Sequence, residues 1–174
     1  MIEEIDKTYD QIENKILNHE IYQNVKDYSK AKEKLKTYLE VGKLLKDADI
    51  KYGNNVIKDY SNRLTMKFGK KDTTSLLYKI KQFYNIVEKV PTLSGKLTWS
   101  HWYEMLPINH IDKIIYYVNQ CEMNNIDVRG LRNKIKSKEY ERLPENTKAQ
   151  LIIQNKIEIK NFVPNPILIK IRII

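Results

Sequence analysis

The sequence is poor in the residues that build disulfide-rich, turn-rich or membrane-spanning proteins. Its 174 residues include one cysteine, five glycines and five prolines, and no apolar run approaches 18 residues. Cys121 has no partner for an intramolecular disulfide, which favours a reducing cytoplasm. So few glycines and prolines argue against a many-stranded sandwich or barrel. We expect no membrane partner, and the acidic start at Met1–Glu4 is unlike a secretory signal.

Recognisable catalytic and metal-binding motifs are also missing. The histidines and Cys121 lack metal-ligand spacing, and no glycine-rich phosphate loop is present. Ser100 and His101 are neighbours that would point about 100° apart on a helix, so they do not form a nucleophile–base pair. Glu158 and Lys160 match the E-x-K pattern of metal-dependent nucleases, which keeps a nuclease as a distant alternative. We expect no catalytic residue, metal, cofactor or small-molecule substrate.

Positive charge is in excess, with 31 basic and 22 acidic residues giving a net charge of +9. Residues 1–50 contain nine lysines and 11 acidic residues, a net charge of −2. The remaining 124 residues contain 22 basic and 11 acidic residues, a net charge of +11. This asymmetry favours a polyanion, most simply nucleic acid, as the partner of the later part. A solvated lysine-rich surface or AT-rich coding would give a similar composition.

Apolar residues recur at helical spacing through most of the chain, which predicts an all-α fold. From Ile2 to Ile16 they are three and four residues apart, which predicts an amphipathic helical arm within residues 1–27. We expect this arm to pack on its own domain, and a homodimer contact through the same seam remains open. Further helices are expected at about 28–48, 54–68, 73–89, 99–106 and 110–122, with one more capped by Asp127.

The segment at about 54–89 resembles a helix-turn-helix unit. Its first helix ends at Gly69, and Asp72 can cap a second helix from Thr73 to about Lys89. The residues expected to face the core in this second helix are Leu76, Ile80, Phe83 and Val87, flanked by Leu77 and Tyr84.

The opposite side of this second helix is polar, which favours nucleic-acid binding. Amide side chains can pair with base edges, hydroxyl groups can bond phosphates, and basic side chains neutralise them. Arg129, Arg132 and Lys136 form a second basic stripe further along, for which pairing with nearby acids is the alternative. The predicted nucleic-acid contacts are Arg63, Lys67, Lys70, Lys71, Thr73, Thr74, Ser75, Tyr78, Lys79, Lys81, Gln82, Asn85, Arg129 and Arg132. An ordinary solvated helix face would look similar.

Several motifs resemble the N-terminal domain of the YhcG family of bacterial proteins. The most distinctive is Thr92–His101, TLSGKLTWSH, which is similar to the family's TLSGQLSWSH. Further matches are Tyr52-Gly53, Leu64–Lys70, Leu77–Tyr84, Val128–Arg132 and Tyr140–Leu143, so the resemblance extends from about Tyr38 to Leu143. It implies a helical domain of winged-helix or helix-turn-helix character, which precedes a PD-(D/E)xK nuclease domain in longer members.

The sequence departs from the family pattern in places. Lys81 replaces an arginine and therefore loses bidentate geometry, Ile126-Asp127 replaces Trp-Ser, and Gly130 replaces an acid. We expect the family-like domain at residues 28–143, followed by a tail at 144–174. That tail is helical near residues 145–153 and β-like at 167–174, as a remnant of the linker to a missing nuclease domain would be.

The predicted function is non-catalytic DNA binding, as the recognition or accessory part of a PD-(D/E)xK nuclease system, and a nuclease supplied by a separate partner chain remains open. The alternative is a protein-interaction or dimerisation module with no direct nucleic-acid contact.

Overall fold

The computed structural model describes residues 2–22, 29–53, 55–69, 73–90 and 97–151. Within these ranges the chain is helical and has no strand, which confirms the all-α fold class. The elements are α1 (Ile2–Tyr22), α2 (Ser29–Tyr52), α3 (Asn55–Phe68), α4 (Thr73–Lys89), α5 (Trp99–Met105), α6 (Ile111–Asn124), α7 (Val128–Lys136) and the 3-10 turn η2 (Tyr140–Arg142). Residues 145–151 are helical again. The segment 167–174 predicted to be β-like lies outside the described residues.

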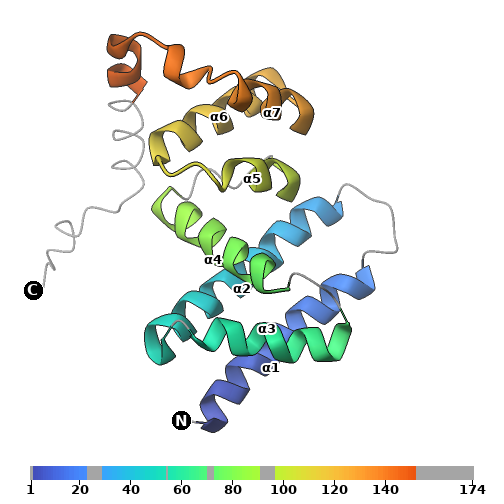
Figure 1. The fold of residues 1–174 in the computed structure, drawn as a ribbon. Helices are drawn as coiled ribbons and strands as arrows, with labels where there is room; N and C mark the ends of the chain where they lie inside the picture. The colour runs from blue at the N-terminus through green and yellow to red at the C-terminus, as the bar shows by residue number, and fades with distance from the viewer. Residues whose placement is uncertain (1, 23–28, 54, 70–72, 91–96, 152–174) are drawn as a thin grey trace, which may run out of the picture.

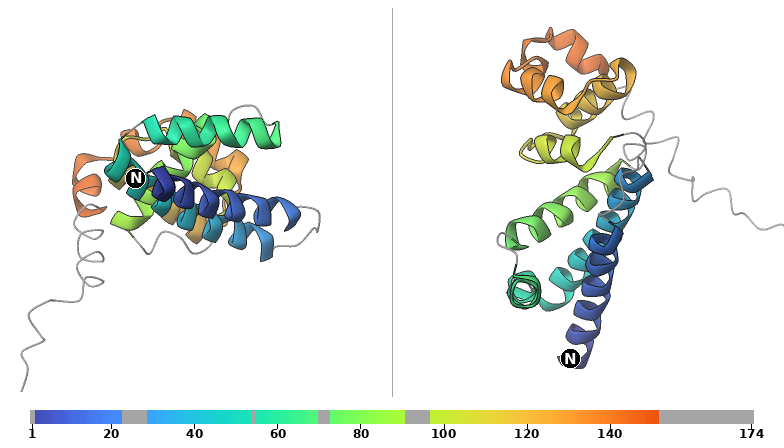
Figure 2. Two further views of the ribbon diagram at one scale, coloured as in Figure 1. Left: turned by 90° about the horizontal axis from the view of Figure 1, so that it is seen from below. Right: turned by 90° about the vertical axis from the view of Figure 1, so that its right-hand side faces the viewer.

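The helices form two stacked groups, with α1 to α4 in one and α5 to α7 in the other (Figure 1). Helix α2 is the centre of the first group, because it contacts α1, α3, α4 and also α5. A second view shows α1 and α2 running side by side, with α4 inclined to them and leading toward α5 (Figure 2). Helix α5 in turn contacts α7, so it connects the two groups.

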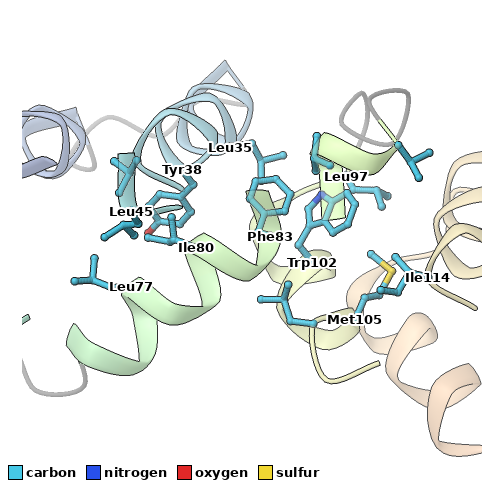
Figure 3. Packing of buried hydrophobic residues seen from close by; sticks show 14 of the residues in the cluster. Leu35, Tyr38, Leu45, Leu77, Ile80, Phe83, Leu97, Trp102, Met105 and Ile114 are labelled. Carbon is cyan, nitrogen blue, oxygen red and sulfur yellow. The ribbon is translucent and has the colours of Figure 1, made fainter. Parts of the chain in front are cut away.

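One continuous hydrophobic core extends through both groups of helices. Phe83 of α4 packs between Leu35 of α2 and Trp102 of α5, and Ile80 lies next to Tyr38 (Figure 3). The Phe83 and Trp102 rings have centroids 4.9 Å apart, and both side chains are fully buried. Burying a large apolar side chain contributes about 1.5–3 kcal/mol. The position of α5 relative to α4 is therefore set by core packing.

The predicted N-terminal arm belongs to the same core. Tyr9 and Ile12 of α1 are buried, and Ile5 and Ile16 pack against the cluster. The regular apolar spacing of this segment is therefore used in contacts with the chain's own helices.

The ends of α2 and α6 are set by backbone conformation. Helix α2 runs to Tyr52, four residues beyond the predicted end, and stops at Gly53, whose φ of 82° favours glycine. Helix α6 ends at Asn124 and is followed by Asn125, which also has a positive φ of 49°. Asp127 caps α7 as predicted, because its Oδ1 accepts a hydrogen bond of 2.8 Å from the Gly130 N–H.

The buried side of α4 differs from the prediction at one position. Leu77 is fully buried, whereas Leu76 is only half-buried, so the expected order of these two residues is wrong. The cause is the close approach of α2. A Cβ at Gly42 of α2 would lie 2.5 Å from the Cβ of Tyr84 and 2.8 Å from the Ile80 oxygen. Helix α2 therefore covers the side of α4 that carries Ile80 and Tyr84, and Leu77 lies on that same side.

Candidate nucleic-acid interface

Two predicted phosphate contacts on α3 are paired with acids of α1. The Arg63 Nη1 atom donates a hydrogen bond of 2.8 Å to Asp6 Oδ1, and its guanidinium lies 3.8 Å from the centroid of the Tyr9 ring. Lys67 forms an ion pair with Glu13, which is buried. Arg63 and Lys67 would have to leave these contacts in order to bind a phosphate.

Lys81, a predicted phosphate contact, is engaged in an ion pair between two helices. Its Nζ pairs with Asp49 of α2, and the two side chains are only 18% and 17% exposed. This ion pair lies between the two helices that pack most extensively on each other. Lys81 is therefore placed as a residue that joins α4 to α2, and its mostly buried ammonium group is paired with Asp49.

These pairs also explain the uneven distribution of charge. The acidic first third of the chain supplies Asp6, Glu13 and Asp49 to basic residues that lie later in the sequence. Glu4 pairs with Lys51 in the same way. Part of the excess positive charge is thus paired with acidic side chains of the same chain.

The rest of the predicted polar side of α4 does lie outside the core. Ser75, Tyr78 and Gln82 are exposed, and Asn85 is half-buried. Thr73 and Thr74 are half-buried, and the Thr74 hydroxyl is hydrogen-bonded to that of Ser61. Lys70 and Lys71, predicted phosphate contacts in the turn before α4, lie outside the described residues.

Two contacts join this exposed side of α4 to α5. The Gln82 Nε2 atom donates a hydrogen bond of 2.7 Å to the Leu106 backbone oxygen at the end of α5. One turn earlier, Lys79 Nζ lies 3.7 Å from the centroid of the Tyr103 ring, a cation–π contact. Tyr103 is not among the predicted contacts, because its place beside Lys79 depends on how α5 packs on α4.

A third contact joins α5 to the basic stripe of α7. The Arg132 guanidinium donates two hydrogen bonds to the Glu104 carboxylate, from Nε at 3.1 Å and from an Nη atom at 2.6 Å. These hydrogen bonds hold the pKa of Glu104 below its usual value. Arg129 and Lys136 lie on the same stripe and are exposed. For Arg132, pairing with a nearby acid is thus what the structure shows.

Within the described residues, no group of three or more His, Cys, Asp or Glu side chains could hold a metal ion. Cys121 is buried, and burial raises the pKa of its thiol to about 11. None of the described helices is long and apolar enough to cross a membrane.

A model of the DUF1016 N-terminal domain matches residues 11–142, more than two thirds of the chain. The chain belongs to the DUF1016 N-terminal domain family. YhcG-like N-terminal domains form this family, so the resemblance based on sequence motifs is confirmed. No curated protein and no solved structure matches the chain.

The DUF1016 match extends from within α1 to η2 and includes the three helices α4, α5 and α7. Its most distinctive motif has a structural role here. His101 Nδ1 is bonded to the Thr98 hydroxyl at 2.8 Å, and its Nε2 is 3.1 Å from the Ile126 oxygen. Nε2 must carry the proton to donate to a carbonyl, so Nδ1 accepts from Thr98. His101 thereby joins the start of α5 to the connection between α6 and α7.

The family motif at Tyr140–Leu143 also makes contacts within the fold. Tyr140 packs against Tyr116 of α6 with ring centroids 5.4 Å apart, and Glu141 pairs with Lys113. Glu139, just before this motif, accepts hydrogen bonds of 2.8 Å from Tyr116 and from Lys134 of α7. The side chains exposed on α4, α5 and α7 are therefore the more promising place for binding.

Proposed function

We propose that this chain binds DNA without catalysing a reaction, as the recognition part of a nuclease system. The binding surface is the α4–α5–α7 face, which consists of Ser75, Tyr78, Lys79, Gln82, Tyr103, Arg129, Arg132 and Lys136. In this proposal α3 and α4 act as a helix-turn-helix pair, and α4 presents its exposed side to the bases. Buried Cys121 fits a reducing compartment, so we place this activity in the cytoplasm.

The observation that carries the proposal is the linkage of the three helices. Lys79 contacts Tyr103, Gln82 bonds to the end of α5, and Glu104 holds Arg132. These contacts bring an amide, a phenol and two basic side chains from separate parts of the sequence together, and the spacing of α7 puts Arg129 and Lys136 on the same stripe as Arg132. Basic groups bind phosphates with little regard to sequence, whereas an amide can read a base edge.

Each group has a distinct role in this proposal. Lys79, Arg129 and Lys136 bind phosphates. Arg132 stays paired with Glu104 and contributes to the positive electrostatic potential of the face. The amide of Gln82 is oriented by Leu106, and this bond leaves its Oε1 and one N–H for a base. An orientation fixed before binding lowers the entropy that binding costs.

The proposal is tested by fluorescence anisotropy with labelled duplex DNA. The face variant combines Lys79→Ala, Arg129→Ala and Lys136→Ala, and we expect it to bind at least about tenfold more weakly than the native chain. The control variant combines Lys7→Ala, Lys36→Ala and Lys43→Ala, which are exposed on α1 and α2 and remove the same charge. Equal weakening in both variants would contradict a specific face, and no binding to any DNA by the native chain would support the protein-interaction alternative.

A further inference from the structure

Two exposed tyrosines lie on the α4–α5–α7 face. Tyr78 on α4 is 41% exposed and Tyr103 on α5 is 46% exposed, whereas the aromatic residues of the core close by are buried. One exposed aromatic ring is ordinary on a protein surface. Here two rings accompany four basic side chains, and this combination of aromatic and basic groups is typical of surfaces that bind single-stranded nucleic acid.

The ring of Tyr103 packs against the ring of Trp99. It meets the Trp99 ring at an interplanar angle of 71°, with centroids 6.4 Å apart. Trp99 in turn packs edge-on against Tyr38 and Phe83, at centroid distances of 4.6 and 5.7 Å. Tyr103 is thus an exposed ring on a rigid support, so its ordering on binding costs little entropy.

A lysine lies beside Tyr103. The ammonium group of Lys79 lies 3.7 Å from the centroid of the Tyr103 ring. A cation over an exposed ring contributes only about 0.5–1 kcal/mol. The ammonium can therefore exchange this ring for a phosphate at small cost, which would uncover the ring face for another planar group.

We propose that Tyr103 stacks on an unpaired base, so that the preferred ligand is a single nucleic-acid strand and not a continuous duplex. Within a duplex each base face is covered by its neighbours and cannot meet an aromatic ring, whereas an unpaired base can. Lys79 moves from the ring to the backbone phosphate of the stacked nucleotide. This inference rests on the proposed function, because both use the α4–α5–α7 face.

The charge of the face favours nucleic acid over a protein partner. Exposed tyrosines and arginines also occur in protein interfaces, but lysine is depleted there. On this face Lys79 and Lys136 accompany the rings. Stacking surfaces and backbone-binding cations are the two parts of a single-strand site.

The test compares three probes of about 15 nucleotides, a length that suits one binding module. They are single-stranded DNA, single-stranded RNA of the same sequence and duplex DNA, and each is titrated with the full chain by anisotropy. We expect one of the single strands to bind at least about fivefold more tightly than the duplex, as one stacked base would provide. The single strand that binds more tightly shows whether the site prefers DNA or RNA.

Substitutions at Tyr103 separate stacking from general stability. Tyr103→Leu should weaken single-strand binding at least about fivefold and duplex binding less than about twofold. Tyr103→Phe keeps the ring and should bind as the native chain does. Thermal unfolding of each variant checks that the fold is retained. Because Trp99 touches Tyr103, a change in tryptophan fluorescence on strand binding gives a second readout.

The outcomes distinguish this inference from the proposed function. Duplex binding that is tighter than single-strand binding, together with no effect of Tyr103→Leu, would overturn the stacking inference and leave DNA binding in place. Absence of binding to all three probes would overturn both. Equal loss in Tyr103→Leu and Tyr103→Phe would assign Tyr103 to hydroxyl contacts and would also overturn stacking.

Discussion

The side chain of Gln82 holds the end of the neighbouring helix, because its Nε2 atom donates a hydrogen bond of 2.7 Å to the Leu106 oxygen. Carbonyl groups at the end of a helix lack partners within that helix. The bond satisfies one of them and joins α4 to α5. The same side chain is exposed on the α4–α5–α7 face. Gln82 therefore has a structural contact and a proposed role in DNA recognition.

Gln82→Glu should affect stability and binding together. A carboxylate cannot donate to the Leu106 oxygen, so we expect the free energy of unfolding to fall by about 1–2 kcal/mol. DNA binding should also weaken, because a negative charge enters the face. Gln11→Glu on α1 is the matched control, since Gln11 is exposed and lies away from the face. Equal stability of the two variants in urea unfolding would contradict the role given to the bond.

Lys81→Ala should destabilise the protein without changing how its DNA affinity responds to salt. The substitution removes the partner of Asp49 at a site where both side chains are mostly buried, so about 1–3 kcal/mol of stability should be lost. Lys79→Ala should do the reverse, with little loss of stability and a weaker salt dependence. Thermal unfolding and salt titration of both variants make the comparison. A weaker salt dependence in Lys81→Ala would return Lys81 to the set of phosphate contacts.

Gly42→Ala should be strongly unfavourable for a helical position. Alanine normally stabilises a helix relative to glycine, but its Cβ would lie 2.5 Å from Tyr84 Cβ and 2.8 Å from the Ile80 oxygen. Because one of these atoms belongs to the backbone, α2 and α4 must separate, and we expect a loss of about 2–3 kcal/mol. Chemical denaturation measures it. A gain in stability would show that the two helices can separate at little cost.

Stability should decrease at alkaline pH between about 10 and 12. Burial raises the pKa of both Tyr38 and Tyr60 to about 12 from the usual 10. Below pH 10 both phenols are neutral in the folded and unfolded states. Above it they ionise first in the unfolded chain, which favours unfolding until the folded groups titrate as well.

Tyr38→Phe removes one of these groups and supplies the check. Its free energy of unfolding should fall less steeply than that of the native chain as the pH rises above 10. Urea unfolding at several pH values between 9 and 11.5, roughly the window set by the two phenols, measures the difference. Parallel curves for the two proteins would contradict the assignment to Tyr38.

Helical spacing was sufficient to predict most elements of the fold. The stripe of Ile80, Phe83 and Val87, the cap at Asp127 and the stop at Gly69 all depend on local sequence, and the structure has them in place. Helical spacing alone could not predict that Leu77 is fully buried and Leu76 only half-buried. This difference depends on the approach of α2 at Gly42, a contact between residues about 40 positions apart in the chain.

The candidate site was predictable only in part, for the same reason. Periodicity correctly placed Tyr78 and Gln82 on the exposed side of α4. It could not show that Lys81 pairs with Asp49 or Arg63 with Asp6, because each pair joins segments far apart in sequence. Tyr103 was missed, since its place beside Lys79 follows from how α5 packs on α4.

The most direct test of the account is the salt dependence of DNA binding by the native chain, the face variant and the control variant. Each lost phosphate contact should reduce the slope of log affinity against log salt by about one unit. The account predicts a reduction of about two to three units for Lys79→Ala, Arg129→Ala and Lys136→Ala together, and almost none for Lys7→Ala, Lys36→Ala and Lys43→Ala. Equal slopes for the face and control variants would contradict it.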